Sequence, residues 1–154
     1  MRALVQRVQE TSIWVDERLI DSIGPGLLVL LGVALEDTDA EAAHLAEKLT
    51  RLRIFADENG KMNRSVLDIR GEMLVVSQFT LYGDTRNGNR PSFSQAAGAD
   101  KANRLYESFV SHCETAGIRV GKGVFQAHMK VHLVNDGPVT LLCSSEHGAR
   151  QSWY

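Results

Sequence analysis

Gly26-Leu27-Leu28-Val29-Leu30-Leu31-Gly32-Val33 is the stretch of this chain with the clearest structural signal. It is apolar at every position between its two glycines, without the alternation of a strand that has one face in water. A short, continuous apolar run of this kind is typical of a strand buried on both faces. Gly24-Pro25-Gly26 favours a sharp break just before it, because Gly and Pro are the strongest turn formers. We therefore predict a strand buried on both faces at residues 26–33.

Elements are predicted on both sides of this strand. Before it, residues 4–8 and 12–15 have strand-like sequence and are predicted to form a first antiparallel pair, with a turn at residues 16–18. After it, Thr38 and Glu41 have the spacing of a capping box, which predicts a helix from there to about Arg51. Apolar residues at spacings of three and four give this helix its buried stripe: Ala42, Leu45, Leu49 and Leu52.

The second half of the chain continues this mixture of strands and helices. Asn59-Gly60 predicts a tight turn, and residues 73–77 predict another buried strand. A helix is predicted from about residue 100 to 115, ending at Gly117 as a left-handed cap. Alternating apolar residues then predict a strand at 129–133, with 139–143 as its neighbour and Asp136-Gly137-Pro138 between them.

The order of these elements is rich in strands and has two main helices, without a regular alternation of strand and helix. We therefore predict an α+β fold: a single compact domain spanning residues 1–154, with a curled, mostly antiparallel, barrel-like sheet. A chain of 154 residues is long enough to bury its own core. Its 44% hydrophobic and 23% charged residues exclude a disordered chain.

Composition also limits location and partners. The longest apolar run is too short to span a bilayer and the N-terminus lacks the layout of a signal peptide, so no membrane partner is predicted. Cys113 and Cys143 fall on a predicted helix and a predicted strand, as buried free thiols do, which favours a cytoplasmic location. The net charge of −2 excludes a general attraction to nucleic acid, so an RNA partner would need a local basic patch.

Two polar clusters end or follow predicted strands: Ser77-Gln78-Phe79-Thr80-Leu81-Tyr82 and Asn135-Asp136-Gly137-Pro138-Val139-Thr140. Neither contains a histidine beside a nucleophile or a set of metal ligands. The hydroxyl of Ser77 or Thr80 would need a neighbouring base before it attacked a substrate, and no sequence signature supplies one. The simpler interpretation is that these hydroxyls cap backbone groups at a strand end. Chemistry at the clusters is expected to rely on main-chain groups, hydroxyls and the substrate itself.

Three further features each have a plain and a functional interpretation. His128 and His132 are at an even spacing, which places both on one face of a strand, but a metal site needs a third ligand and none stands nearby, so no metal is predicted. Gly137-Pro138 is either an ordinary turn or a cis peptide, whose two successive carbonyl oxygens would face one side and accept an ammonium group. The loop at residues 86–92, with its two arginines, is equally consistent with an exposed loop and with a phosphate contact.

At these clusters the sequence closely resembles the D-aminoacyl-tRNA deacylases, also called D-tyrosyl-tRNA deacylases, over essentially its full length. The matching motifs stand in the family's order, at residues 1–8, 26–33, 52–55, 60–63, 76–81, 90–93 and 135–140. The chain departs from the usual pattern outside the two clusters: Gly83 replaces an alanine, Asn87 a common lysine and Gln126 a frequent glycine, and Asp16-Glu17 lacks a turn glycine. The change at Asn87 removes a possible phosphate contact.

The resemblance implies a compact α+β, barrel-like homodimer that hydrolyses the ester joining a D-amino acid, or misattached glycine, to the terminal adenosine of tRNA. It implies contact mainly with the acceptor end of aminoacyl-tRNA, and no metal or organic cofactor. Gly137-Pro138 would be the glycine–cis-proline motif that reaches into the other subunit's active site, oriented by Arg7. The pocket for the adenosine and the aminoacyl group would be lined by Ser77, Gln78, Phe79 and Thr80, with Phe125 and Met129 on the adenine side.

The implied reaction is compatible with the absence of a base in the motifs. An aminoacyl ester is already activated, and the backbone N–H groups of Phe79 and Thr80 would stabilise the oxyanion that develops on its carbonyl. In the family the ribose 2′-hydroxyl of the substrate is thought to assist. If the carbonyls of Gly137-Pro138 hold the α-ammonium, an L side chain meets rigid backbone and a D side chain points to solvent. Glycine has no side chain that could clash with this backbone, so some cleavage of glycyl-tRNA is predicted.

Three alternatives remain open at this stage. The first is a non-catalytic module that binds the acceptor end of tRNA without turnover. The second is a related deacylase with a trans Gly137-Pro138 bond, acting on tRNA mischarged with L-alanine. The third is a conventional serine esterase, which ranks last because no base or acid partner is visible in the sequence.

Overall fold

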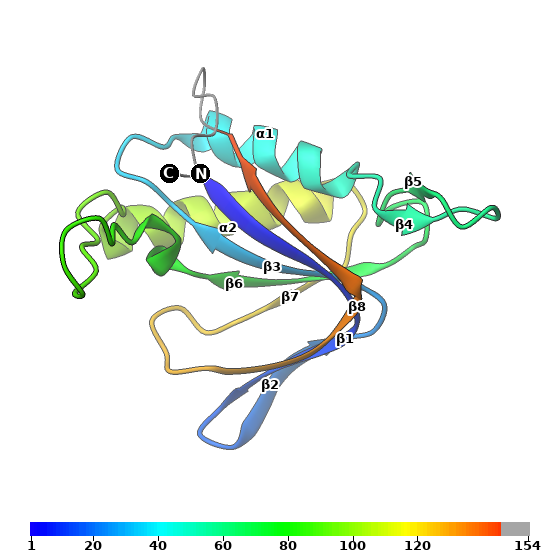
Figure 1. Ribbon diagram of the computed structural model, residues 1–154, viewed down its shortest axis with the longest axis horizontal. Helices are drawn as coiled ribbons and strands as arrows, with labels where there is room; N and C mark the ends of the chain where they lie inside the picture. The colour runs from blue at the N-terminus through cyan, green and yellow to red at the C-terminus, as the bar shows by residue number, and fades with distance from the viewer. Residues whose placement is uncertain (146–154) are drawn as a thin grey trace.

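A six-stranded mixed sheet forms the centre of the structure, a computed structural model that describes residues 1–145 (Figure 1). Its strands follow the order β2-β1-β3-β6-β7, and β8 pairs with β1. β1 is antiparallel to β2, β3 and β8, whereas β3, β6 and β7 run parallel to one another. The elements, in chain order, are β1 (Arg2–Val15), β2 (Arg18–Ile23), β3 (Gly26–Gly32), α1 (Asp39–Thr50), β4 (Phe55–Ala56), β5 (Met62–Arg64), β6 (Glu72–Ser77), the 3₁₀ turn η1 (Phe79–Tyr82), α2 (Ala99–Thr115), β7 (Val120–Lys122) and β8 (Lys130–Ser144).

β3 occupies the middle of the sheet, between β1 and β6, and all its residues except Leu30 are buried. This confirms the buried strand predicted from the apolar run, and the structure places it at the centre of the sheet. Gly26 is required at its start, because a Cβ atom there would lie 2.0 Å from the carbonyl oxygen of Glu72 in β6. The close approach of these two parallel strands therefore depends on a residue without a side chain.

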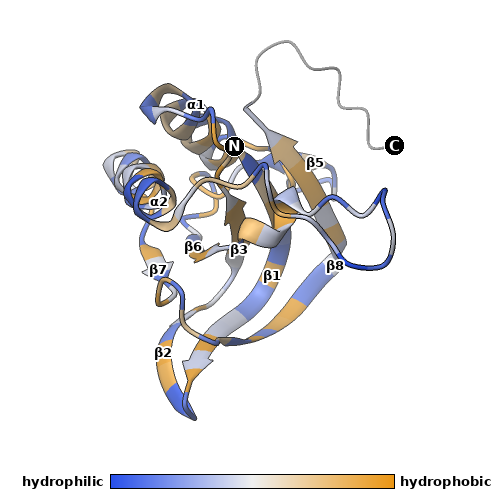
Figure 2. Ribbon diagram, turned by 90° about the vertical axis from the view of Figure 1, so that its left-hand side faces the viewer, coloured by the Kyte–Doolittle hydropathy of each residue, from blue (hydrophilic) through white to orange (hydrophobic). Residues whose placement is uncertain are grey.

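β1 curls the sheet, because this one strand has three partners. Residues 2–8 pair with β3, residues 11–15 pair with β2, and β8 follows β1 along most of its length. The bend is visible in Figures 1 and 2, where β1 and β8 sweep together around the core. The sheet is thus nearly closed into a barrel, as predicted. Its parallel part, from β3 to β7, was not foreseen by the mostly antiparallel prediction.

The two helices lie side by side along one face of the sheet, with much of their apolar surface toward it (Figure 2). α1 begins at the predicted capping box, in which Thr38 and Glu41 satisfy each other's backbone amides. α2 ends before Gly117, whose φ of +97° is the predicted left-handed cap. Both helices contribute to a core that also contains Cys113 and Cys143, which are buried free thiols. Neither helix of the described residues is long and apolar enough to cross a membrane.

Two predicted strand pairs are instead single strands. Residues 4–8 and 12–15 both belong to β1, which continues through the polar residues between them with a break in its pairing to β8. Residues 129–133 and 139–143 are not neighbours either, since most of both segments lies in β8. Val8 pairs with Asn135 and Gln6 with Thr140, so that residues 136–139 of β8 stand opposite Arg7 alone. Asp136-Gly137-Pro138 is therefore a bulge within a strand and not a turn between two strands.

Candidate active site

The first predicted cluster lies where β6 ends and the chain turns into η1. Ser77 is the last residue of β6, and the amide of Gln78 donates to the carbonyl oxygen of Leu31 at 2.8 Å. The side-chain amide of Gln78 donates to the hydroxyl of Thr80. The backbone amides of Phe79 and Thr80, at the start of η1, have no hydrogen-bond partner among the described residues. Two N–H donors are thus left available side by side.

A cavity of about 530 Å³ lies beside these residues. Five of the predicted pocket residues form part of its wall. Thr80 is not among the lining residues, but its hydroxyl accepts a hydrogen bond from Gln78, which is. The wall also includes small residues that the sequence did not single out, and these widen the cavity because they carry almost no side chain. The lining consists of Val76, Ser77, Gln78, Phe79, Ala97, Ala99, Ala102, Phe125, Gln126, Ala127, His128, Met129 and Val131.

This cavity is lined mainly by apolar side chains, with a few polar ones, and carries almost no formal charge. His128 is its one titratable residue among the described residues that line it, and no carboxylate or lysine is present there. The Thr80 hydroxyl has an amide as its neighbour and not a base. A hydroxyl in such surroundings is a weak nucleophile. The arrangement suits the binding of an uncharged aromatic ring and of a carbonyl group whose oxygen becomes negative during reaction.

The second predicted cluster is held by Arg7. Its Nε donates to the carbonyl oxygen of Asp136 at 3.1 Å, and its Nη1 donates to the carbonyl oxygen of Ile54 at 2.5 Å. From the other side, the Asn135 amide donates to the carbonyl oxygens of Arg7 and Val139. The peptide bond between Gly137 and Pro138 is cis, and Gly137 has a φ of +133°. The bulge is therefore fixed on both flanks by side chains that bind its backbone.

The two clusters do not meet within one chain. Three strand-to-strand steps, from β8 to β1, β3 and β6, separate the bulge from Ser77, and each step spans about 4.8 Å. Neither Gly137 nor Pro138 lines the 530 Å³ cavity. In Figure 1 the bend of β8 lies at the right and η1 at the left. Within the described chain, the bulge therefore takes no part in the wall of this cavity.

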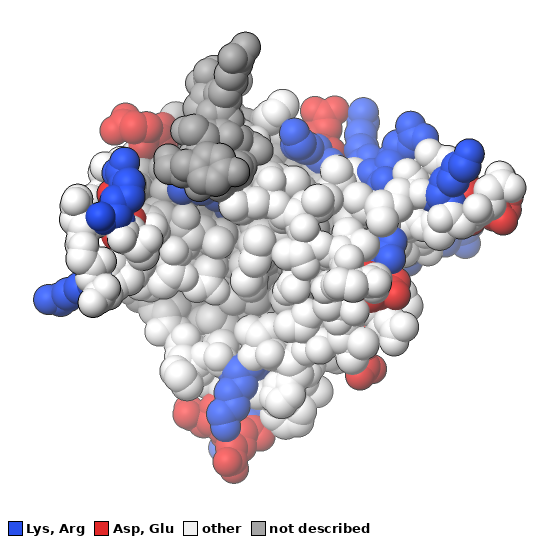
Figure 3. Space-filling view, viewed as in Figure 1, with Lys and Arg blue, Asp and Glu red and all other residues white. Residues whose placement is uncertain are grey.

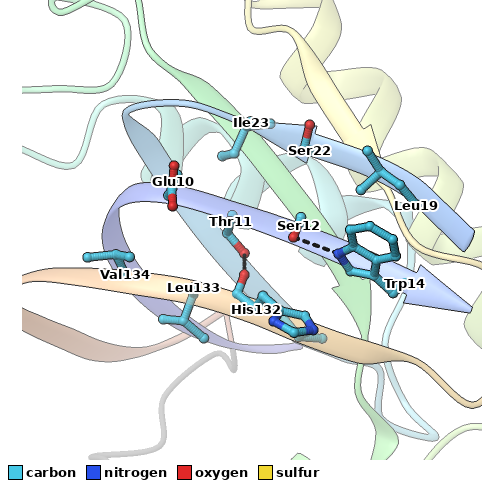
Figure 4. Close-up of a pocket in the computed structure, with 11 residues that line it drawn as sticks. Glu10, Thr11, Ser12, Trp14, Leu19, Ser22, Ile23, His132, Leu133 and Val134 are labelled. Atoms are coloured by element: carbon cyan, nitrogen blue, oxygen red, sulfur yellow. Dashed lines mark hydrogen bonds between the residues drawn. The ribbon is translucent and has the colours of Figure 1, made fainter. Parts of the chain in front are cut away.

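The two histidines that were predicted to share a face line two different cavities, and the second cavity has a volume of about 750 Å³ (Figure 4). His132 lines it, beside Trp14 and Ser12 of β1, whereas His128 lines the first cavity. The prediction of one shared face is wrong because β8 begins only at Lys130, after a turn at Gln126 with a φ of +63°. Within residues 1–145 no cluster of three His, Cys, Asp or Glu side chains is placed to bind a metal.

The arginine-containing loop folds back beside η1. Asp84 and Ser92 exchange backbone hydrogen bonds of 2.7 and 2.9 Å, which close the loop at its base. The Arg86 guanidinium binds the Asp84 carboxylate and holds the pKa of that carboxyl well below its usual range. The side chain of Arg90 is exposed and has no partner in the described part of the chain. A phosphate contact by this loop remains a prediction.

Known proteins share this fold and sequence. A model of the D-Tyr-tRNA(Tyr) deacylase family matches residues 4–144. The chain is 61% identical to a D-aminoacyl-tRNA deacylase of Roseiflexus castenholzii over 94% of this chain and 92% of the relative. It is 57% identical to one of Thermotoga petrophila, over 94% of this chain and 97% of the relative.

Solved structures give the same result. A c-Myc DNA unwinding element binding protein superposes with a TM-score of 0.90 and 43% identity, over 95% of this chain and 99% of the other. A probable eukaryotic D-amino acid tRNA deacylase, at 18% identity, superposes with a TM-score of 0.81 over 92% and 97% of the two chains, which is a likeness of fold alone. With a family match across nearly the whole described chain and relatives above half identity, this protein belongs to the D-Tyr-tRNA(Tyr) deacylase family.

Proposed function

We propose that this protein hydrolyses the ester of D-aminoacyl-tRNA, releasing the free amino acid and the tRNA. The observation that carries the proposal is the pair of unpartnered amides of Phe79 and Thr80 beside a nearly uncharged cavity. Such a site accepts the terminal adenosine in the cavity and presents two N–H donors to the ester carbonyl. Family membership supplies the ester as the reacting group.

The reaction proceeds by addition of water to the ester carbonyl. The oxygen of water bonds to the carbonyl carbon, and the carbonyl oxygen becomes an oxyanion that accepts hydrogen bonds from the amides of Phe79 and Thr80. One donor of this kind is worth about 10²–10³ in rate. The C–O bond to the ribose then breaks, and the ribose oxygen takes a proton. Because the cavity offers no carboxylate or lysine as base, the neighbouring ribose hydroxyl of the substrate assists the proton transfer.

Chiral selection comes from a second copy of the chain. The partner subunit's Gly137 and the partner subunit's Pro138 enter the cavity mouth, and their carbonyl oxygens accept the α-ammonium of the substrate. An L side chain then meets backbone that Arg7 and Asn135 hold in place, whereas a D side chain points outward. Glycine has no side chain to be rejected, so glycyl-tRNA is also cleaved.

Several features support such a homodimer. The bulge cannot serve the cavity of its own chain, since three strand-to-strand steps lie between them. β8 exposes Leu133, Val134 and Leu141, which are more than one-third accessible. Figure 3 shows that the face over β1 and β8 carries few Lys, Arg, Asp or Glu across its middle, as the centre of an interface does.

Binding of RNA is confined to the acceptor end, and the place of action is the cytoplasm, where aminoacyl-tRNA is used.

The decisive experiment follows the release of labelled amino acid from D-tyrosyl-, L-tyrosyl- and glycyl-tRNA, with EDTA present. We expect fast release from the D ester, measurable release from the glycyl ester and none above background from the L ester. Equal release of the D and L esters would contradict the chiral role of the bulge. Binding of tRNA without any release would identify a non-catalytic binding module.

A further inference from the structure

Two aromatic rings lie exposed at the edge of the candidate active site. Phe79 is 54% accessible and Phe93 is 36% accessible, with ring centroids 5.0 Å apart and planes inclined at 71°. Large apolar side chains that gather on a surface mark a place where something binds. Phe79 also lines the 530 Å³ cavity, so the pair, which we term the aromatic ledge, continues outward from the cavity mouth.

The position of Phe93 is fixed by its neighbours. A Cβ atom on Gly83 would lie 3.1 Å from Cε1 of the Phe93 ring, so the ring packs directly on backbone. The amide of Gly83 donates to the carbonyl oxygen of Thr80 at 3.0 Å, which joins the loop to η1. The backbone exchange between Asp84 and Ser92 holds the loop segment that carries Phe93. The ledge is therefore formed before any ligand arrives.

Positive charge stands in the same loop. Arg86 is 79% accessible, but its guanidinium is already paired in a bidentate manner with the Asp84 carboxylate. Arg90 carries an exposed guanidinium with no partner among residues 1–145. Exposed aromatic rings beside arginines are the composition of surfaces that bind single-stranded nucleic acid, in which bases stack and the backbone meets the cations.

We propose that the aromatic ledge stacks the base of the nucleotide that precedes the terminal adenosine, and that Arg90 binds a phosphate of this single-stranded end. The inference rests on the proposed function, which places the terminal adenosine in the cavity. The chain that leaves the cavity past Phe79 then meets Phe93 first. Stacking uses the face of a base and no hydrogen-bonding edge, so the ledge selects for a single strand and not for sequence.

The test compares ligands that differ by one nucleotide. Wild-type protein is titrated with unacylated adenosine and with the dinucleotide CpA, and hydrolysis is followed with their 3′-D-tyrosyl esters. We expect CpA to bind about five- to 150-fold better than adenosine, and its ester to gain as much in kcat/KM, which is the range for one stacked base. Phe93→Leu should abolish most of this gain and leave the adenosine ester unchanged. Arg90→Gln should reduce CpA binding and make it less dependent on salt.

Met62→Ala is the matched control, because Met62 is a 52% accessible apolar side chain on β5 and should leave both ligands unchanged. Circular dichroism establishes that each variant is folded. An undiminished CpA gain in Phe93→Leu overturns the ledge, as does an equal loss with adenosine. A Phe93→Leu variant that instead weakens self-association, measured by sedimentation, shows that the rings are a protein interface. If wild-type protein hydrolyses no ester, the proposed function fails, while the binding titrations still decide on the ledge.

Discussion

Arg7 and Asp136 are joined twice across the β1–β8 pair. The Nε of Arg7 lies 3.1 Å from the carbonyl oxygen of Asp136 and 3.2 Å from its Oδ2. The same guanidinium reaches the carbonyl oxygen of Ile54 through Nη1. One cation thus ties the bulge of β8 to the segment that leads into β4. The geometry of residues 136–138 is consequently set by a side chain far away in sequence.

Replacement of Arg7 by lysine should separate charge from geometry. An ammonium group cannot serve both carbonyl oxygens in the planar fork that a guanidinium provides. We expect Arg7→Lys to lower the ratio of D- to L-tyrosyl-tRNA cleavage at least tenfold, which is an order-of-magnitude expectation, and to cost about 1–3 kcal/mol of unfolding free energy. Asp136→Asn is the control, since it keeps the backbone carbonyl and weakens only a half-exposed ion pair. An unchanged D/L ratio in Arg7→Lys would remove this arginine from chiral selection.

Gly137→Ala should damage the bulge directly. A Cβ atom there would lie 2.8 Å from Cγ2 of Val139 and 3.1 Å from a guanidinium nitrogen of Arg7, and the φ of +133° is unfavourable for any other residue. We expect loss of D-specific cleavage together with reduced stability. Gly60→Ala serves as the control, because it has a φ of +76° but open space around the added atom. Full activity and chirality in Gly137→Ala, with Gly60→Ala equally active, would contradict the assigned role.

Thr80→Val tests the absence of a covalent nucleophile. The substitution removes the hydroxyl that accepts from Gln78 but retains the backbone amide proposed to stabilise the oxyanion. We expect kcat/KM for D-tyrosyl-tRNA to fall by no more than about tenfold, whereas loss of a true serine-type nucleophile costs about 10⁶ in kcat. Single-turnover kinetics provide the measurement. A fall beyond about a thousandfold would make the hydroxyl essential.

Glu17→Gly should stabilise the protein. Asp16 and Glu17 form the two-residue turn between β1 and β2 with φ values of +47° and +63°, a conformation in which side chains are strained. Relief of this strain exceeds the added freedom of the unfolded chain, so we expect a gain of about 0.5–1 kcal/mol in urea unfolding. Arg18→Gly, one residue later in β2 and outside the left-handed region, should destabilise instead. Equal effects of the two substitutions would argue against strain at Glu17.

Stability should decline at high pH. Burial raises the pKa of the Cys113 thiol from 9.0 to about 12, and it also raises the pKa of Tyr106 and of Cys143. Above pH 9 the unfolded chain releases protons that the folded chain retains, so the unfolding free energy falls as the pH rises from about 9 to 12. Urea unfolding at pH 8, 9, 10 and 11 measures this, and Cys113→Ala should flatten part of the decline. A stability that stays constant up to pH 11 would contradict the effect.

The elements that sequence determined are those with a local cause. The capping box of Thr38 and Glu41, the turn at Gly60 and the left-handed cap at Gly117 each depend on residues within one helical turn, and all three were predicted correctly. The buried strand β3 was predicted because a short, continuous apolar run is typical of a strand that is buried on both faces. The candidate site residues came from the family motifs, which also name the reacting ester.

The tertiary structure decided how these pieces meet. The polar residues near Glu10 and the Asp136-Gly137-Pro138 segment are of types that occur both in loops between strands and in bulges within a strand. Only the pairing of β1 with β8 shows that here they lie within strands. The cavity likewise combines β6, the start of α2 and the segment before β8, which sequence spacing cannot bring together. Strand register and cavity walls depend on contacts between distant residues, which no local propensity encodes. Sequence therefore supplied the chemical groups, and the order of strands in the curled sheet determined that the bulge and the cavity of one chain lie three strands apart.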